Sequence, residues 1–232
     1  MRRTYEINEL AKEESWRMFR IMGEFVDGFD VLSQFQPAVT IYGSARIKED
    51  HLVYAQAREI GGGLARAGFS VFTGGGPGVM AAANQGAKEE RGNSIGLFIR
   101  LNSQEAPNPF TTLSLSFRYF FVRKVMLVRY ATAFILMPGG LGTMDELFET
   151  LTLIQTQRIR PFPVILFGSQ YWNGLLEWMR KDMIGDRFIK PEDLKRLVIT
   201  DDPAETVAVV ERWYRKGHRK ARSEEKEGGT SG

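Results

Sequence analysis

The chain has 232 residues and a formal net charge of +3, from 31 Lys and Arg against 28 Asp and Glu. It has no Cys, which excludes a disulfide framework, a thiolate zinc site, an iron–sulfur cluster and a Cys nucleophile, and its two His leave almost no room for a multi-histidine metal site. Hydrophobic residues make up 43% and charged residues 25%, an ordinary globular composition in a chain long enough for one large domain with its own core.

The N-terminal run MRRTYEINELAKEESW mixes both signs of charge where a secretory signal peptide would need an apolar segment. No apolar run approaches the ~18 residues that a membrane span requires. We therefore expect a cytoplasmic protein without a membrane partner.

Positive charge gathers near the C-terminus, at Arg212, Arg215, Lys216, Arg219, Lys220 and Arg222. We interpret this cluster as the solvated end of a helix, where basic residues suit the helix macrodipole. Binding of nucleic acid is the alternative interpretation, and we do not expect it. The sequence thus predicts a single domain over residues 1–216 and a flexible, basic and polar tail over residues 217–232.

The first half of the chain predicts a long helix and then repeated strand–helix steps. Apolar residues at helical spacing indicate an N-terminal helical extension over about residues 9–35, which ends before Pro37. Three apolar β-rich runs follow, each bounded by Gly, and the first two lead into helices. Successive βα steps are typical of a parallel sheet. The predicted elements are strand Ala38–Tyr42, a helix through Ala67, strand Phe69–Phe72, helix Val79–Glu90 and a strand that ends near Ile99.

The second half continues the pattern after a long loop rich in Pro and Asn, which begins at Leu101 and contains a short strand near Leu113–Phe117. Fully apolar strands indicate a sheet that helices cover on both faces. The predicted elements are a helix around FFVRKVMLVRYA, strand Ala133–Met137, helix Thr143–Gln155, strand Pro163–Phe167, helices Tyr171–Met183 and Ala204–Tyr214, and a candidate edge strand at Leu197–Ile199. We therefore predict an α/β fold.

Two glycine-dense turns, in FSVFTGGGPGVMAAA and AFILMPGGLGTMDELFE, each join an apolar strand to a helix. Glycine lets backbone N–H groups turn toward a ligand, and the helix N-terminus adds unpaired donors and partial positive charge. Either loop alone could be a tight turn that binds nothing. Two such loops at one edge of a parallel sheet favour a phosphate site.

Two other motif matches carry little weight. The stretch Gly76–Ala81 satisfies G-x-G-x-x-A, but the next strand runs into Arg100 where a dinucleotide site needs an acidic residue. The stretch Gly92–Gly96 satisfies G-x-S-x-G, but Ser94 precedes its strand, whereas a nucleophile elbow follows one. The sequence therefore disfavours NAD, FAD and a Ser nucleophile.

Three charged residues stand out beside the second glycine loop. Arg123 and Lys124 lie near the start of an apolar helix, and Glu146 lies in the first turn or so of the helix after PGGLGT. An Arg in an apolar setting needs an anionic partner. One interpretation is a structural Arg–Glu ion pair. The other is a cationic clamp and a carboxylate that together bind a phosphorylated sugar and cleave a bond at its anomeric carbon.

These motifs resemble the lonely guy family of cytokinin riboside 5′-monophosphate phosphoribohydrolases, often labelled lysine decarboxylase-like. The resemblance rests on RK followed by PGGxGTxxE, on YGSAR after the first strand, on TGGGPGVMAAANQGA after the second and on PNPF in the loop. It covers about Val39–Phe167, and the long N-terminal helix is similar to the larger branch of the family. It implies a Rossmann-like three-layer sandwich with a mostly parallel central sheet flanked by helices.

The resemblance also implies a reaction and a set of site residues. Water would cleave the N-glycosidic bond of a nucleoside 5′-monophosphate, AMP or N6-prenylated AMP, to give free base and ribose 5-phosphate, with no metal or other cofactor. Arg123 and Glu146 would be the catalytic pair. The 5′-phosphate would be held by Gly139, Gly140, Gly142 and Thr143, and the rest of the pocket would be lined by Lys124, Gly43, Ser44 and Gly75. The resemblance further implies a homodimer or higher homo-oligomer, up to a hexamer, with the site near the subunit interface.

Two alternatives accompany this prediction. Related proteins bind nucleotides or carry molybdenum cofactor without turnover, and a carrier would need the glycine loop but no carboxylate facing it. Lysine decarboxylation would need a lysine Schiff base with pyridoxal phosphate and a carboxylate on its pyridine nitrogen. No motif in the sequence marks that arrangement, and Lys124 is instead expected to contact phosphate.

Overall fold

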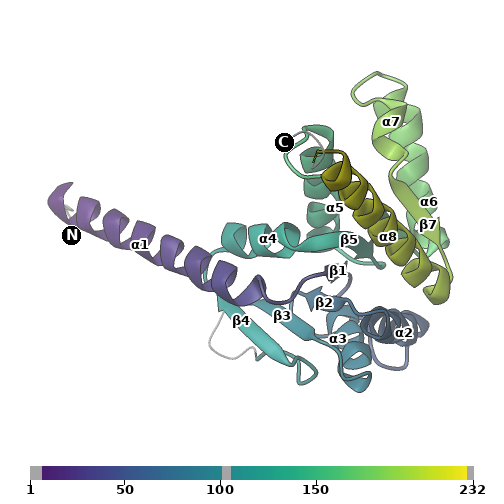
Figure 1. Cartoon of the computed structure of the whole chain (residues 1–232). Helices are drawn as coiled ribbons and strands as arrows, with labels where there is room; N and C mark the ends of the chain where they lie inside the picture. Colours follow the sequence, from purple (N-terminus) through teal and green to yellow (C-terminus); the bar gives the residue numbers. More distant parts are fainter. Residues whose placement is uncertain (1–6, 101–105, 229–232) are drawn as a thin grey trace.

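The structure is a computed structural model that describes residues 7–100 and 106–228 (Figure 1). The first five residues of the predicted long loop, 101–105, and the last four of the predicted tail, 229–232, lie outside the described residues. No helix among the described residues is long and apolar enough to cross a membrane.

The core of the fold is a seven-stranded sheet in the order β4-β3-β2-β1-β5-β6-β7. Every neighbouring pair is parallel, so the predicted parallel sheet is confirmed. The chain builds outward in one direction from β1 to β4, then returns to the other side of β1 with β5. The strands are β1 (Ala38–Tyr42), β2 (Ser70–Thr73), β3 (Ser94–Ile99), β4 (Leu113–Phe117), β5 (Ala131–Leu136), β6 (Val164–Phe167) and β7 (Leu197–Thr200).

Helices cover both faces of this sheet, which confirms the Rossmann-like three-layer architecture (Figure 1). Successive strand residues point to opposite faces: Phe134 and Leu136 pack in one core, and Ala133 and Ile135 pack in the other. The first core contains side chains of α4 (Phe120–Arg129), α5 (Leu141–Gln155) and α6 (Ser169–Trp178), and the second contains side chains of α2 (Leu52–Arg66), α3 (Val79–Glu89) and α8 (Pro203–Gly228).

Several helix boundaries differ from the predictions. The predicted end of the last helix at Tyr214 is wrong, because α8 continues to Gly228. This stretch has no Pro, and the good helix formers Lys, Arg, Ala and Glu outnumber its Gly217, His218 and Ser223. Helix α5 begins at Leu141, directly after its Gly140 N-cap, so Glu146 lies in its second turn. Helix α6 ends at Trp178 and continues as a π-helical turn, Met179–Ile184, before the short α7 (Pro191–Leu194).

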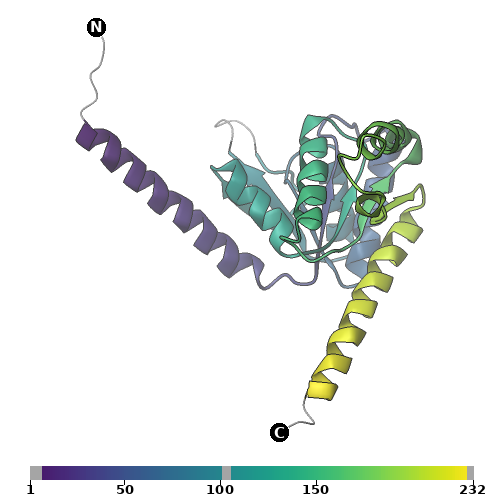
Figure 2. The same cartoon turned by 90° about the horizontal axis from the view of Figure 1, so that it is seen from above.

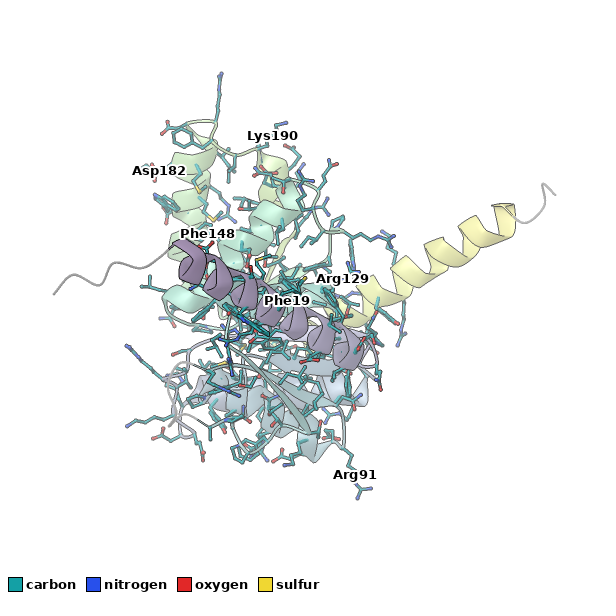
Figure 3. The ribbon with its side chains drawn as sticks, turned by 90° about the vertical axis from the view of Figure 1, so that its left-hand side faces the viewer. Phe19, Arg91, Arg129, Phe148, Asp182 and Lys190 are labelled. Atoms are coloured by element: carbon teal, nitrogen blue, oxygen red, sulfur yellow. The ribbon has the colours of Figure 1, made fainter. Side chains whose placement is uncertain are left out.

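Helix α1 (Ile7–Leu32) packs by its C-terminal part against α4, and its N-terminal part extends away from the sheet (Figure 2). Its Glu24 carboxylate accepts a hydrogen bond from the Arg118 N–H, at 2.9 Å. Figure 3, in which α1 crosses the front of the molecule, labels Phe19, whose exposed fraction is 62%. The helix therefore presents apolar surface that this chain alone leaves uncovered; its large exposed apolar side chains are Trp16, Met18, Phe19, Met22, Val26 and Phe29.

Candidate functional site

A cleft of about 750 Å³ opens at the carboxyl ends of β1, β2 and β5. We call it the main cleft. It lies where the sheet order reverses, between β1 and β5, which is the position at which open α/β sheets bind their ligands. Its walls come from the loop after β1, the loop after β2, the loop after β5 and the helices α4 and α5.

Backbone contacts fix the three loops against one another. The Ser44 N–H donates to the Pro138 carbonyl, and the Val79 N–H donates to the Ser44 carbonyl, each at 3.0 Å. Gly78 has φ +67°, and a Cβ there would collide with the Ser44 carbonyl oxygen, so only glycine fits this crossing. Gly139 is equally enclosed, because a Cβ would collide with the Thr143 hydroxyl. The glycines thus build a fixed floor for the main cleft.

The start of α5 forms the end of the main cleft that suits an anion. Gly140, Gly142 and Thr143 all line the cleft, and the Gly140 N-cap supplies no side chain to the first turn. The first N–H groups of a helix have no intrahelical acceptor and carry the positive end of its dipole. A phosphate placed here would take up these donors.

Glu146 brings a buried carboxylate into the same cleft. Its exposed fraction is 5%, and its Oε2 atom has no hydrogen-bond partner among the described residues. Burial raises its pKa to about 7, although the positive charge of Lys124 opposes the shift. Near neutral pH this carboxyl can therefore exist in either state, as a group that accepts and returns a proton must.

Arg123 lies opposite, in the first turn of α4. Its Nε is buried with no hydrogen-bond partner among the described residues, and its Cζ lies 5.3 Å from the centre of the Phe120 ring. Burial lowers its pKa, and the negative charge of Glu146 opposes that shift; the guanidinium stays charged. No ion pair within 4.0 Å joins Arg123 to Glu146 in the described part of the chain. The structural ion pair that the sequence left open is therefore absent from these residues, and both groups can contact a ligand.

Eight of the ten predicted site residues line the main cleft: Gly43, Ser44, Arg123, Gly139, Gly140, Gly142, Thr143 and Glu146. Lys124 does not line it, because its Nζ lies 2.8 Å from Asp145 Oδ2 and 2.9 Å from Glu149 Oε2 in a cluster between α4 and α5. Gly75 does not line it either. Its N–H donates to the Thr73 hydroxyl at 3.0 Å, and its carbonyl accepts from the Asn108 N–H at 2.8 Å.

Three residues with polar side chains line the main cleft and were not predicted. Arg46 adds an exposed cation on the loop after β1, in the run YGSAR. The Tyr171 hydroxyl donates to the Gly139 carbonyl. Tyr42 has an exposed fraction of 6%, and its hydroxyl has no hydrogen-bond partner among the described residues. Its place as the last residue of a strand, directly before Gly43, is the signal that could have revealed it, since strand ends meet at this edge.

A second cavity, of about 890 Å³, adjoins the main cleft. We call it the side cavity. Arg123, Gly74 and Met80 line both, so these residues stand between them. Apolar groups such as Phe98 dominate its wall, which also contains Asn108. Space for a mostly apolar group therefore adjoins the cleft that contains the anion site.

A buried polar network holds the wall of the side cavity. The Asn84 Oδ1 atom accepts from the Thr73 hydroxyl at 2.6 Å and from Asn108 Nδ2 at 3.1 Å, and Asn84 Nδ2 donates to Ser94 Oγ at 2.8 Å. Asn108 Nδ2 also donates to the Gly76 carbonyl, at 3.0 Å. The PNPF segment is thus attached to the glycine loop after β2.

Fold and site together define a Rossmann-like protein with an anion-binding cleft at its topological switch point. Within that class, the chain belongs to the family described as "Possible lysine decarboxylase", whose model matches residues 80–210, more than half of the chain.

Two curated relatives carry the same enzyme name. A cytokinin riboside 5′-monophosphate phosphoribohydrolase of Arabidopsis thaliana, LOG5, is 31% identical over 143 residues, 61% of this chain and 62% of the relative. The enzyme of the same name from Mycobacterium tuberculosis is 26% identical over 156 residues, 63% of this chain and 79% of the relative. The chain thus spans less than two thirds of the plant relative.

Solved structures agree in fold. The molybdenum cofactor carrier protein of Chlamydomonas reinhardtii is similar with a TM-score of 0.56 and 21% identity, over 77% of this chain and 98% of that one. A structural-genomics target is similar with a TM-score of 0.60 and 24% identity, over 76% of this chain and 99% of that one. At these identities the likeness establishes the Rossmann-like fold alone.

The chemistry in the family's description does not fit the main cleft. Pyridoxal phosphate is held as a Schiff base on a lysine, and no lysine lines this cleft in the part of the chain that the structure describes. Lys124, the lysine next to Arg123, has its Nζ held by two carboxylates.

Proposed function

We propose that this protein hydrolyses the N-glycosidic bond of a nucleoside 5′-monophosphate, AMP or N6-prenylated AMP, to free base and ribose 5-phosphate. The observation that carries the proposal is the buried Glu146 carboxyl, with a pKa of about 7, in one cleft with the unpartnered Arg123 and an open helix N-terminus. The names of the curated relatives support the same activity.

The cleft suggests how the substrate would lie. The 5′-phosphate accepts from the first-turn N–H groups of α5, around Gly140 and Gly142. Glu146 is four residues further along α5 than Gly142, an axial rise of about 6 Å, so the ribose lies between the phosphate site and this carboxylate. The base then extends past Arg123, which stays beside the sugar, into the side cavity, whose wall is mostly apolar.

Glu146 and Arg123 have separate parts in the reaction. As the bond between C1′ and the base nitrogen breaks, its electron pair leaves with the base, and positive charge develops on the sugar. Ionised Glu146 stabilises that charge and takes a proton from the water whose oxygen bonds to C1′. The departing base gains a proton, so the net change is addition of one water. Arg123 clamps the phosphorylated sugar by charge.

A non-catalytic carrier of a nucleotide or of molybdenum cofactor is the second candidate. The likeness in fold to a solved molybdenum cofactor binding protein and to a solved molybdenum cofactor carrier protein supports it. Against it stands Glu146, because burying a carboxyl without a hydrogen-bond partner costs free energy and a passive anion binder gains nothing from it.

We further propose that the protein is a homodimer or a higher homo-oligomer, up to a hexamer. Large exposed apolar side chains continue from α1 onto α4, at Phe120, Phe121 and Val125, and patches of this kind mark protein interfaces. Leu141, beside the anion site, has an exposed fraction of 89%. Leu127 and Leu147 are buried in the core of this chain, so they do not contribute to this exposed apolar surface. The molecular mass in solution, from light scattering, tests this proposal.

The activity is tested by incubating the purified protein with AMP, with N6-isopentenyl AMP and with adenosine, and by separating base from sugar phosphate chromatographically. We expect free base from a monophosphate and much less from adenosine, which cannot occupy the anion site. Tight binding of AMP with no release of base from any of the three would support the carrier.

A further inference from the structure

We propose that Tyr42 and Glu146 form a subsite for one hydroxyl of the substrate's ribose, and that this subsite makes the protein select ribonucleotides over deoxyribonucleotides. The inference rests on the proposed function and deepens it, because it concerns the same cleft.

Tyr42 is held in place at the wall of the main cleft. It is the last residue of β1, and its ring packs edge-on against Phe134, with the ring centres 5.4 Å apart. Its side chain belongs to the core on the α4 and α5 face of the sheet. The ring therefore cannot swing out to solvent, and its hydroxyl stays where the strand places it.

The Tyr42 hydroxyl has an unmet hydrogen bond. The hydroxyl is buried and has no partner in the described part of the chain. Buried polar groups are normally hydrogen-bonded, and an unpaired one costs free energy. Since phenylalanine would fill the same space in the apolar core without that cost, the hydroxyl itself calls for a partner that arrives with the ligand.

Glu146 supplies the complementary atom. Its Oε2 is also buried and unpartnered, and it lines the same cleft. Burial, the negative charges of Glu146 and Glu149 and a side-chain hydrogen-bonding interaction with Glu146 all raise the pKa of Tyr42, so Tyr42 remains a donor at neutral pH. The two side chains therefore lie near each other, yet the Tyr42 hydroxyl and Glu146 Oε2 do not meet the geometry of a hydrogen bond. An unmet donor thus faces the same cleft as an unmet acceptor.

A hydroxyl group suits both atoms, because it can accept from Tyr42 and donate to Glu146 at once. An ionised phosphate ester has no proton to donate. The sugar is the part of the substrate that lies beside Glu146 in the proposed pose, and it carries two hydroxyls. A hydrogen bond from a sugar hydroxyl to the carboxylate also strengthens as positive charge develops at C1′.

The test compares AMP with 2′-deoxy-AMP and 3′-deoxy-AMP in the wild-type protein and in Tyr42→Phe, which keeps the ring and removes only the hydroxyl. We expect kcat/KM of the wild type to fall about 10- to 100-fold for one of the two deoxy substrates, as for a lost hydrogen bond to a charged group. For AMP, kcat/KM of Tyr42→Phe should be about 10-fold below that of the wild type. For that deoxy substrate, the variant and the wild type should have the same kcat/KM.

Tyr171→Phe is the matched control, since its hydroxyl donates to the Gly139 carbonyl and its loss should affect all three nucleotides equally. Equal losses for all three substrates in Tyr42→Phe would overturn the proposal and indicate a bound water or a purely structural hydroxyl, as would no loss at all. If the wild type releases no base from any nucleotide, the proposed function fails. The subsite is then tested by the Kd of AMP, 2′-deoxy-AMP and 3′-deoxy-AMP for the wild type and for Tyr42→Phe. We expect weaker binding of one deoxy nucleotide to the wild type, and no further weakening of that nucleotide in Tyr42→Phe.

Discussion

The pH dependence of AMP hydrolysis tests the role of Glu146. The carboxyl must be ionised to assist the attacking water, and burial raises its pKa to about 7. At a pKa of about 7, roughly half of the groups are ionised at pH 7 and about one tenth at pH 6. We therefore expect kcat/KM to fall about fivefold from pH 7 to pH 6 and to rise about twofold from pH 7 to pH 8.

Two neighbouring charges allow the acid limb of the pH profile of kcat/KM to be moved in opposite directions. The positive charge of Lys124 lowers the pKa of Glu146, and the negative charge of Glu149 raises it. Neither side chain lines the main cleft. Lys124→Met should therefore move the limb to higher pH, and Glu149→Gln should move it to lower pH. The substrate phosphate, which titrates near pH 6, gives a limb that neither substitution moves.

The assay is the initial rate of base release at subsaturating AMP, from about pH 5.5 to about pH 8.5, for the wild type and both variants. A substitution at Asp145 is unsuitable as a control, because Asp145 pairs with Lys124 and its loss would change the charges around Glu146. Glu192→Gln serves instead, since Glu192 lies on α7, away from the cleft. A limb that stays at one pH in all four proteins, or that moves the same way in both test variants, would refute the assignment of Glu146.

Three further outcomes follow from the structure. The pKa of Glu146 is about 7 in the folded protein, against an ordinary value of 4.5, so the free energy of unfolding of the wild type falls as pH rises between these values. Denaturant unfolding should therefore show Glu146→Gln to be more stable than the wild type by on the order of 3 kcal/mol at pH 8 and equally stable at pH 4. Gly139→Ala should weaken AMP binding and lower Tm, because its Cβ collides with the Thr143 hydroxyl. Gly140→Ala should keep the wild-type Tm, because a Cβ there meets nothing within 4 Å. Equal losses of Tm in the two variants would contradict this. Asn84→Ala should cost about 1–3 kcal/mol of unfolding free energy, because it leaves buried partners unsatisfied, and an unchanged midpoint would show that the network contributes nothing.

Much of the fold could be predicted because most of its strands are apolar runs, and β1, β2, β5 and β6 lead into glycine turns. All seven strands lie within a few residues of their predicted places. The order of the strands could not be predicted, since most of them are apolar on both faces and pairing depends on contacts distant in sequence. The end of α8 was misplaced because the apolar pattern stops at Tyr214, while helix-forming polar residues continue the helix to Gly228.

The candidate site, like the fold, could be predicted from the sequence only in part. The glycine loops, Arg123 and Glu146 were placed at one edge of the sheet by sequence, and the structure brings them to one cleft. The sequence could not tell which of Arg123 and Lys124 faces that cleft, because adjacent helix residues point about 100° apart. Tyr42 escaped notice because the last residue of an apolar strand looks like one more core side chain.

Release of adenine and ribose 5-phosphate from AMP, compared between the wild type and Glu146→Gln, tests the central claim most directly. We predict equal amounts of the two products from the wild type and a loss of at least about 100-fold in the variant, as for removal of a general base, with AMP still bound. Unchanged release in Glu146→Gln, or bound AMP that the wild type never cleaves, would contradict it.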